Sequence, residues 1–384
     1  MSRRMRIAQI APLIERVPPE TYGGTERVVA YLTDALIALG HEVTLFASGD
    51  SKTRATLVPV RPKAMRLDPS CGDWLADHLV LIDRVAGMAP LFDVIHFHTG
   101  FLQFPMSRTL SVPHVTTLHG RLDLPYLLPL FRQFHDVPLV SISNAQRRPV
   151  PAAAWQGTVY HGLDPGLLAF SPQAEDYVVF LGRIAPEKRP DRAIDIARAA
   201  GVRLKIAAKV DKIDEQYFAE VIEPMLHADG VEFLGEISEE QKGTLLGGAR
   251  ALLFPIDWPE PFGMVVIESL AAGTPAIAWN HGSVPELIDH GRTGFIVNSI
   301  EEAVEAVRCA TDLDRRQCRE AFEQRFTADR MARDYVAVYD GLLAPVRRRH
   351  EESQRERPRR GPEPVLHRRE PGAEGRSDPR PQAC

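Results

Sequence analysis

The residues with the clearest chemical potential are two cations and two carboxylates in two short segments. Arg183 and Lys188 stand in FLGRIAPEKRP, and Glu260 and Glu268 stand in EPFGMVVIE. Arg183 ends an apolar run, and Lys188 follows where a helix is expected to begin. Two cations beside a helix N-terminus suit a diphosphate, because an anion offsets the unfavourable positive charge there. Solvated surface cations are the alternative.

The two carboxylates indicate how a long ligand would be held. Pro261 suits the first helical position and Gly263 allows close approach of the backbone to a ligand. Along a helix, Glu260 and Glu268 would lie roughly 12 Å apart, about the distance from the ribose to the hexose of a nucleotide sugar. A helix-terminal carboxylate and an exposed helical one are the simpler interpretation. A glycosidase pair is another, but it leaves the two cations without a role.

The first half of the sequence offers weaker signals. In PPETYGGTER, Gly23 and Gly24 precede Thr25, which is expected to be a helix N-cap. Backbone N–H groups there could face a phosphate, although the loop is not a GxGxxG fingerprint. His119 ends the predicted strand PHVTTLHG. It could contact a sugar hydroxyl or accept a proton, and a structural role fits its position equally well.

Metal binding is not the favoured interpretation of any motif. His96 and His98 lie on one face of a predicted strand, but no further ligands follow with a fixed spacing. Asp312 and Asp314 form a DLD sequence that is interpreted as helix capping. We therefore expect no metal and no other cofactor.

Short apolar runs that alternate with amphipathic stretches must position these residues. This alternation predicts parallel sheets with crossover helices, hence an α/β fold. The predicted strands are 6–12, 41–48, 93–98, 113–120, 138–144, 158–162, 177–184, 203–209, 231–237, 251–256, 275–279 and 294–298. The predicted helices include 25–40, 188–200, 215–226, 238–248, 262–272 and 284–290.

The strands fall into two series, which predicts two Rossmann-like, doubly wound domains facing a central cleft. Residues 1–165 would form the first and 166–330 the second, with a linker at 161–176. Residues 331–346 are expected to form a helix that crosses back to the first domain. In such folds the ligand site lies at the carboxyl ends of strands, where the strand order reverses. Functional residues should therefore follow strands.

Composition excludes several classes of protein. The chain has 384 residues, a net charge of −5, and 44% hydrophobic and 25% charged residues, which is typical of globular proteins and gives no case for nucleic-acid binding. No apolar run approaches the ~20 residues of a membrane span, and the N-terminus is interpreted as a strand and not a signal sequence. We expect a cytoplasmic protein whose four cysteines are reduced thiols.

Two segments raise the question of peripheral membrane contact. Residues 347–384 hold eleven arginines and seven acidic residues, with few large apolar ones. This composition predicts disorder, and either an inert tail or an electrostatic tether to an anionic surface. The apolar stretch 125–134 is interpreted as core, with a lipid-facing lip as the alternative.

Several motifs together resemble family four of the retaining glycosyltransferases, which have the GT-B fold. The resemblance spans roughly residues 5 to 343. It rests on YGGTE (22–26), TLHG (117–120), SISNA (141–145), HGLD (161–164), LGRIAPEK (181–188), FLGE (233–236) and EPFGMVVIESLAAGTP (260–275). The Glu-x7-Glu element, at its distance from GRxxxEK, is the most specific of them.

The resemblance implies roles for the matching residues. Arg183 and Lys188 would bind the donor diphosphate, Glu268 the ribose, and Glu260 with His119 the sugar. The remaining donor contacts would come from Gly23, Gly24, Phe262, Gly263, Met264 and Val265, and the base would lie near Lys209, Leu234, Gly235 and Glu236. HGLD replaces the commoner NGVD, and AAKVD (207–211) replaces a glycine-bearing turn, a departure that bears on the base contacts.

The implied activity is metal-independent transfer of a sugar from a nucleoside-diphosphate sugar to a hydroxyl acceptor, with retained anomeric configuration. The acceptor would be a sugar, a lipid or a natural product. Two other functions stay open on this scaffold. One is epimerisation or hydrolysis of a nucleotide sugar, and the other is non-catalytic binding of it.

Overall fold

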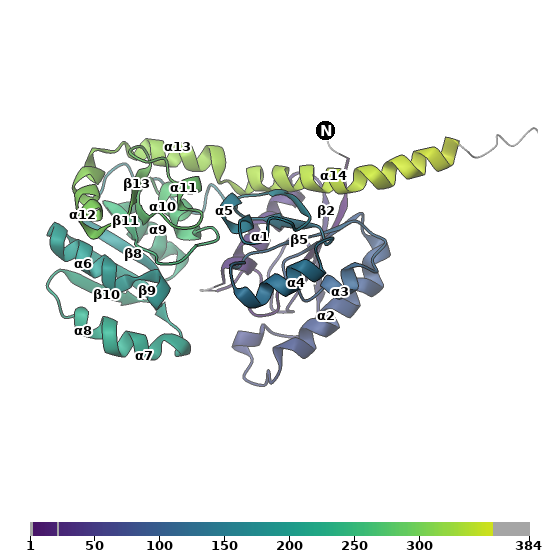
Figure 1. Cartoon of the computed structure of the whole chain (residues 1–384), viewed down its shortest axis with the longest axis horizontal. Coiled ribbons are helices and arrows are strands. Elements are labelled where there is room, and N and C mark those ends of the chain that lie inside the picture. Colours follow the sequence, from purple (N-terminus) through teal and green to yellow (C-terminus); the bar gives the residue numbers. More distant parts are fainter. Residues whose placement is uncertain (1–2, 21–22, 356–384) are drawn as a thin grey trace, which may run out of the picture. The chain divides into compact units, whose positions relative to one another are not determined.

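The computed structural model describes residues 3–20 and 23–355, and among them the strands form two wholly parallel sheets (Figure 1). In the first sheet the strand order is β3-β2-β1-β4-β5-β6-β7. Its strands are β1 (Arg6–Ile10), β2 (Glu42–Ala47), β3 (Thr56–Pro59), β4 (Val94–Phe97), β5 (His114–Thr117), β6 (Leu139–Ser141) and β7 (Trp155–Thr158).

The second sheet has the order β10-β9-β8-β11-β12-β13. Its strands are β8 (Tyr177–Ile184), β9 (Arg203–Val210), β10 (Val231–Gly235), β11 (Ala251–Phe254), β12 (Ala276–Trp279) and β13 (Gly294–Val297). The predicted α/β class with two Rossmann-like, doubly wound sheets is confirmed. Strand order reverses beside β1 and β4 in the first sheet and beside β8 and β11 in the second.

Helices cross between the strands of each sheet (Figure 1). Those connecting the first sheet are α1 (Gly24–Ala38), α2 (Trp74–Met88), α3 (Phe104–Ser107), α4 (Leu128–Gln133) and α5 (Asn144–Arg147). Those connecting or following the second are α6 (Pro190–Ala200), α7 (Glu215–Tyr217), α8 (Glu223–Met225), α9 (Glu239–Gly248), α10 (Met264–Ala271), α11 (Val284–Leu287), α12 (Ile300–Cys309), α13 (Arg315–Arg325) and α14 (Ala328–Arg355).

The buried cores contain the short apolar runs of the sequence that were predicted as strands. The strands β11 and β12 and the first half of β8 are wholly buried, as expected for a parallel sheet covered on both faces. In the segment 125–134, Leu127 and Phe131 are buried with Phe104 and Leu139, which is core packing, whereas Tyr126 is 70% exposed.

The linker and the last helix tie the two sheets together. Leu163 N–H donates to Phe326 carbonyl at 2.9 Å, and Ala328 N–H donates to Leu163 carbonyl at 2.8 Å, so the two chain crossings run side by side. Beyond them, Tyr335 and Tyr339 of α14 are buried in the core of the first sheet. The first residues of the segment 161–176 are therefore packed against the second chain crossing.

The C-terminal boundary differs from the expectation. By its contacts the chain divides into Met1–Leu343 and Ala344–Cys384. Disorder was predicted from residue 347, but α14 continues to Arg355. Its last turns are rich in Arg, Glu and Gln, which have high helix propensities. Residues 356–384 lie outside the described part of the chain.

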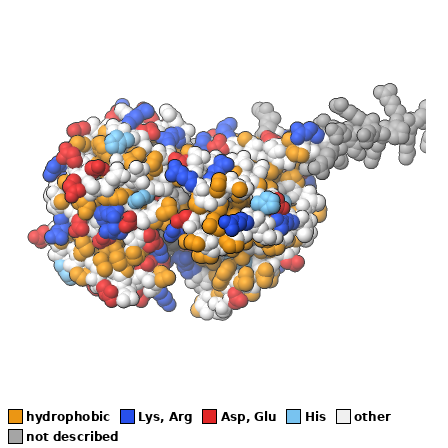
Figure 2. All heavy atoms as spheres, in the orientation of Figure 1, with side chains coloured by type: hydrophobic (Ala, Val, Ile, Leu, Met, Phe, Trp, Pro, Cys, Tyr) orange, Lys and Arg blue, Asp and Glu red, His pale blue; other side chains and the backbone are white. Residues whose placement is uncertain are grey.

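The face of the described residues seen in Figure 2 carries charges of both signs. Acidic and basic side chains are interspersed over the visible face (Figure 2). No helix in the described residues is long and apolar enough to cross a membrane. Cys71, Cys309 and Cys318 are free thiols, as expected.

Candidate functional site

A cavity of about 570 Å³ gathers residues that follow strands of both sheets. From the first sheet it receives the segments after β1 and β5. From the second it receives the ends of β8 and β9 and the loop between β11 and α10. The cavity thus lies at the carboxyl ends of the strands and next to both reversals of strand order, where this class of fold binds ligands.

Most of the predicted site residues meet in this cavity. They are Gly23, Gly24, His119, Arg183, Lys188, Lys209, Glu236, Glu260, Phe262, Gly263, Met264, Val265 and Glu268. Leu234 and Gly235 do not line it, in contrast to the prediction. Both belong to β10, whose register shifts between Phe233 and Gly235, and Leu234 is 37% exposed.

The glycine loop of the first sheet owes its shape to Gly23. This residue has φ 153°, and a Cβ there would lie 2.8 Å from Cβ of Pro19. Gly23 is also the N-cap of α1, and its carbonyl accepts from Arg27 N–H at 3.1 Å. The expectation that Thr25 caps the helix is wrong, because the helix has already begun at Gly24. The loop thus presents its backbone to the cavity.

The corresponding element of the second sheet is the start of α10. Gly263 is its N-cap in the left-handed region, with φ 83°, and the helix begins at Met264. Pro261 is therefore not its first helical residue, and the spacing of 12 Å along a helix axis does not apply to Glu260. The first N–H groups of a helix, here those of Met264 and Val265, have no acceptor within it. They give the cavity wall partial positive charge.

Arg183 and Lys188 both have carboxylate partners in the structure. Arg183 Nη1 lies 2.9 Å from Asp214 Oδ2, and its Nη2 lies 2.5 Å from Glu187 Oε1. Burial raises the pKa of Asp214, against the lowering effect of Arg183. Lys188 Nζ contacts Glu260 Oε2. The alternative interpretation of Arg183 and Lys188 as solvated surface cations is therefore wrong.

Lys188 also lies outside the helix for which it was predicted. It ends a 3₁₀ turn, Pro186–Lys188, and α6 begins at Pro190. Its Nζ lies 4.7 Å from the centre of the Trp258 ring, within range of a cation–π contact. The turn, the aromatic ring and Glu260 together hold the ammonium group at the cavity.

Glu268 belongs to a second group of charged side chains. It is only 6% exposed, so the interpretation as an exposed helical residue is wrong. Its Oε1 accepts from Lys242 Nζ at 2.6 Å, and Lys242 also lies 2.9 Å from Glu239. Glu239 in turn lies 2.5 Å from Arg27 of α1. This network joins α10, α9 and α1 across the cavity.

The sequence did not single out Lys242, Glu239 or Arg27. No motif carries Lys242 and Glu239; they lie in the first turns of the helix α9. Arg27 directly follows YGGTE, and its pairing with Glu239 spans more than two hundred residues. Such a contact depends on the placement of both domains, which local periodicity does not specify.

His119 lies in a cluster of buried imidazoles. Its Nε2 is 2.9 Å from His98 Nδ1, and its ring stacks on His161 with centroids 5.2 Å apart. Burial lowers the pKa of His119 to about 3 and that of His161 well below its usual range. Both rings line the cavity as neutral groups. His161, from the departure HGLD, was not predicted as a site residue.

At the far side of the cavity, Lys209 Nζ lies 2.9 Å from Asp211 Oδ1. Both residues come from AAKVD, the segment that lacks the expected glycine. Lys209 and Glu236 line the cavity beside Ala207 and Ala208. This wall combines small apolar side chains with two charged ones, which suits a flat ring with polar edges.

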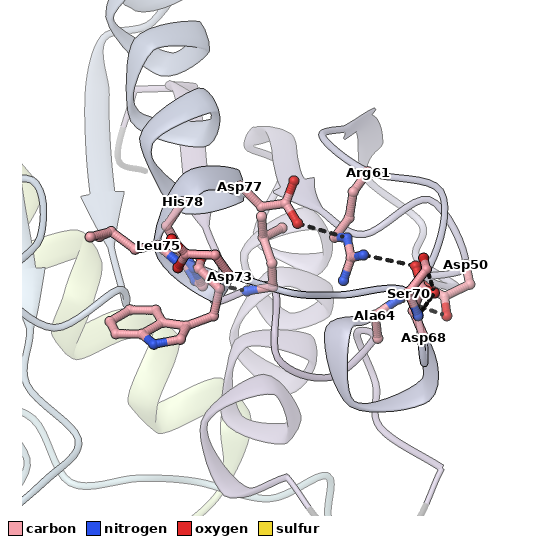
Figure 3. Close-up of polar contacts among 11 residues, drawn as sticks. Asp50, Arg61, Ala64, Asp68, Ser70, Asp73, Leu75, Asp77 and His78 are labelled. Atoms are coloured by element: carbon pink, nitrogen blue, oxygen red, sulfur yellow. Dashed lines mark hydrogen bonds and ion pairs between the residues drawn. The ribbon is translucent and has the colours of Figure 1, made fainter.

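The wall formed by the first domain contains an anchored loop. Arg61 lies 2.8 Å from Asp68 and 3.3 Å from Asp77, and Asp73 caps α2 through Leu75 N–H (Figure 3). The loop is thereby held against α2.

The same loop carries Arg66 to the cavity. Arg66 N–H donates to Ile14 carbonyl at 3.0 Å, and its Nε lies 2.9 Å from Glu15 Oε1. Burial raises the pKa of Glu15, and it raises that of the neighbouring Glu26 to about 7. The sequence carries no recognisable motif in these loops.

Two Rossmann-like sheets whose strand ends share one cavity are the arrangement of the GT-B fold. Residues 22–189 match the model of Glycosyltransferase Family 4, and residues 169–325 match that of Glycosyl transferases group 1. The chain belongs to the family-four glycosyltransferases.

Similar proteins agree with this assignment. The chain is 26% identical over 333 residues to a phosphatidyl-myo-inositol mannosyltransferase from Mycobacterium leprae, covering 78% of this chain and 85% of that protein. It is 26% identical over 370 residues to a glycogen synthase from Mycobacterium tuberculosis, covering 81% and 88%. The structure of AviGT4, a glycosyltransferase involved in avilamycin A biosynthesis, matches with a TM-score of 0.68 at 26% identity, covering 88% and 98%. The three names describe different products, so the similarity identifies the family and leaves the substrate open.

Proposed function

We propose that this glycosyltransferase moves a sugar from a nucleoside-diphosphate sugar to a hydroxyl group, with retained anomeric configuration and without a metal ion. One observation carries the proposal. Arg183, Lys188 and the start of α10 line one cavity. Two cations and a helix N-terminus are the groups that bind a diphosphate.

The charged pairs in the cavity support an exchange of partners on binding. Lys188 contacts Glu260, and Arg183 contacts Asp214 and Glu187. A diphosphate would replace these carboxylates as the partner of the cations. Glu260 would then be released to accept hydrogen bonds from sugar hydroxyls, which explains why a carboxylate stands so close to the phosphate site.

The two ends of the donor fit the remaining walls. The sugar would lie between Glu260, the backbone of Phe262 to Val265, and His119. The ribose would contact Glu268, whose carboxylate Lys242 holds in place. The base would lie against Ala207, Ala208 and Lys209. The identity of the base is left open.

Catalysis would act mainly on the leaving group. As the bond from the anomeric carbon to the phosphate oxygen breaks, negative charge grows on the diphosphate, and Arg183, Lys188 and the N–H groups of α10 stabilise it. The acceptor oxygen attacks the same face of the sugar, and its proton passes to the departing phosphate. Membership of the family supports this retaining course. The cations supply the positive charge that a metal would otherwise provide.

The first test is donor binding and turnover. A panel of UDP-, GDP- and ADP-sugars should raise the melting temperature when a donor binds, since a ligand of the folded state stabilises it by mass action. The stabilising donor is then incubated with hydroxyl acceptors, with and without EDTA, and the anomeric configuration of the product is read by NMR. We expect a transferred sugar, unchanged by EDTA.

Arg183→Ala should lower kcat by at least about a hundredfold, in the range found when one preorganised donor to an oxyanion is removed. Arg316→Ala, on the far helix α13, is the matched control and should keep full activity. Full activity of Arg183→Ala would overturn the assignment. Epimerised sugar or acceptor-independent release of nucleotide would indicate the epimerase or hydrolase alternative. Tight binding without turnover would indicate a binding protein.

A further inference from the structure

Gln9 and His98 form a hydrogen-bonded chain behind His119 that the proposed reaction leaves unused. Gln9 lies on β1 and is fully buried, and His98 directly follows β4. His98 Nε2 is 2.8 Å from Gln9 Oε1, and His98 Nδ1 is 2.9 Å from His119 Nε2. His98 thus connects Gln9, a buried residue of the first sheet, to His119 in the cavity wall.

The amide of Gln9 determines which atoms of this chain carry protons. An amide oxygen accepts and never donates, so His98 must carry its proton on Nε2. Burial, together with the neighbouring imidazoles, holds the pKa of His98 well below its usual range, so the ring is neutral. A neutral ring protonated on Nε2 has a lone pair on Nδ1. His119 must therefore donate from its own Nε2.

This tautomer determines which ring nitrogen of His119 can accept a hydrogen bond in the cavity. Because His119 is neutral and protonated on Nε2, its Nδ1 is a hydrogen-bond acceptor. This Nδ1 is buried, and it has no hydrogen-bond partner among the described residues. The ring itself lines the cavity. A buried acceptor without a partner at a cavity wall is a site for a ligand that donates a hydrogen bond.

Tyr339 of α14 sets the donor-to-acceptor direction of these hydrogen bonds. Gln9 Nε2 donates to Tyr339 hydroxyl at 3.2 Å, and that hydroxyl lies 2.7 Å from His96 Nδ1. Since the Tyr339 oxygen accepts from Gln9, its own proton points to His96. Reversing the chain would require Gln9 to turn its amide. It would also leave a buried N–H of His119 without a partner, and buried N–H groups without partners are rarer than acceptors.

We propose that Gln9 and His98 are positioning residues that hold His119 in the Nε2–H tautomer, so that its Nδ1 accepts a hydrogen bond from one hydroxyl of the donor sugar. The proposal rests on the proposed function for its ligand. Under this proposal the hydroxyl determines specificity because it donates the hydrogen bond to His119. A site built around such a hydrogen bond discriminates strongly against an analogue that lacks the group.

The ligand-free protein tests the tautomer directly. In protein labelled with ¹⁵N-histidine, the shifts of the two ring nitrogens distinguish a protonated nitrogen from an unprotonated one. We expect His119 to show Nε2 protonated and Nδ1 unprotonated, and Gln9→Met to shift both signals toward a mixture. The matched control is Gln103→Met, since Gln103 is also fully buried in the first domain but bonds to Gly100 and Thr116. It should leave the His119 signals unchanged.

His98 provides the rescue experiment. His98→Asn retains an amide oxygen that can accept from His119 Nε2, and it should preserve the tautomer better than His98→Leu. Protonation of His119 on Nδ1 in the wild type would overturn the proposal. An unchanged tautomer in Gln9→Met would overturn it equally.

Donor analogues test the consequence for specificity. The sugar of whichever nucleotide sugar stabilises the wild type is replaced, one hydroxyl at a time, by hydrogen or by fluorine, and dissociation constants are compared. At one position both analogues should bind about tenfold more weakly, because fluorine cannot donate a hydrogen bond. Gln9→Met should reduce this factor, and Gln103→Met should keep it.

Two results of the analogue experiment would count against the proposal. Full recovery by fluorine at every position would overturn it, because the hydroxyl would then serve as an acceptor. Absence of binding by any nucleotide sugar would instead refute the proposed function. The tautomer measurement needs no ligand, and it would still decide whether Gln9 and His98 hold His119 in the Nε2–H tautomer.

Discussion

Lys188 and Glu260 contact each other in the cavity, and so do Lys242 and Glu268. Each charged side chain proposed to bind the donor therefore already has a partner of opposite charge. A cation held by a carboxylate remains ordered without ligand, and binding becomes an exchange of partners. The two pairs differ in accessibility, because Glu268 and Lys242 are the more deeply buried.

This burial gives a prediction for Lys242. Lys242→Met leaves Glu268 as a buried carboxylate without its closest cation, which should lower the free energy of unfolding by about 3 kcal/mol. Urea denaturation measures the change. The control is the double variant Lys242→Met, Glu268→Gln, which removes the uncompensated charge and should recover most of the loss. Equal stability of the single variant and the wild type would mean that the pair is solvated.

A second prediction concerns the pH dependence of stability that the buried carboxylate of Glu26 causes. Burial raises its pKa from 4.5 to about 7, so between these values the folded state binds more protons than the unfolded state. The free energy of unfolding must then fall as pH rises through that window, by up to about 3 kcal/mol. Glu26→Gln does not titrate. Urea midpoints at pH 4.5 and 7.5 should therefore show the variant gaining stability relative to the wild type as pH rises. A difference that is independent of pH would contradict this.

At the scale of elements, the sequence predicted whatever depends on local periodicity. The strand at 177–184 has the observed bounds of β8, and Arg183 lies at its end as expected. Both glycine segments follow strands and begin helices. The joint placement of Arg183, Lys188, Glu260 and His119 in one cavity followed from the rule that parallel sheets bind ligands at strand ends.

What escaped prediction depends on contacts between distant segments. The start of α10 moved to Met264 because Gly263 adopts a left-handed conformation, which composition alone does not distinguish from a helix interior. Lys242 and Arg27 face the cavity only because α9 and α1 are brought together by the fold. The tautomer of His119 depends on Tyr339, far along the chain.

The loop that carries Glu260 gives a prediction at this scale. Gly282 and Gly291 both have positive φ, 56° and 75°, but a Cβ on Gly282 would lie 2.3 Å from the carbonyl oxygen of Glu260, whereas one on Gly291 meets nothing within 4 Å. Alanine at either position costs about 1–2 kcal/mol of backbone strain. Only Gly282→Ala should also displace Glu260 and lower kcat/KM at least about tenfold. Equal kcat/KM values for the two variants would refute this coupling.

At the scale of the molecule, the cavity is complete only when both domains contribute to it. The chain passes between them twice, and Gly162 lies so close to Thr327 that a Cβ there would be 2.2 Å from its carbonyl oxygen. These crossings lie beside each other, so they form one joint. Contacts away from the joint must therefore keep the two walls of the cavity together.

Glu286 makes contacts of this kind, in addition to the Arg27–Glu239 ion pair. From α11, its carboxylate accepts from the N–H groups of Asn144 and Ala145 at 2.7 Å each and from Tyr160 hydroxyl at 2.9 Å. Glu286→Ala removes these bonds but no core contact, so the domains should separate more often without unfolding. We expect about fivefold weaker donor binding, equivalent to about 1 kcal/mol, and a larger radius of gyration by X-ray scattering. Glu305→Ala, an exposed glutamate of α12, should change neither quantity. If Glu286→Ala keeps the wild-type affinity and radius, the joint and the Arg27–Glu239 ion pair suffice to hold the cavity closed.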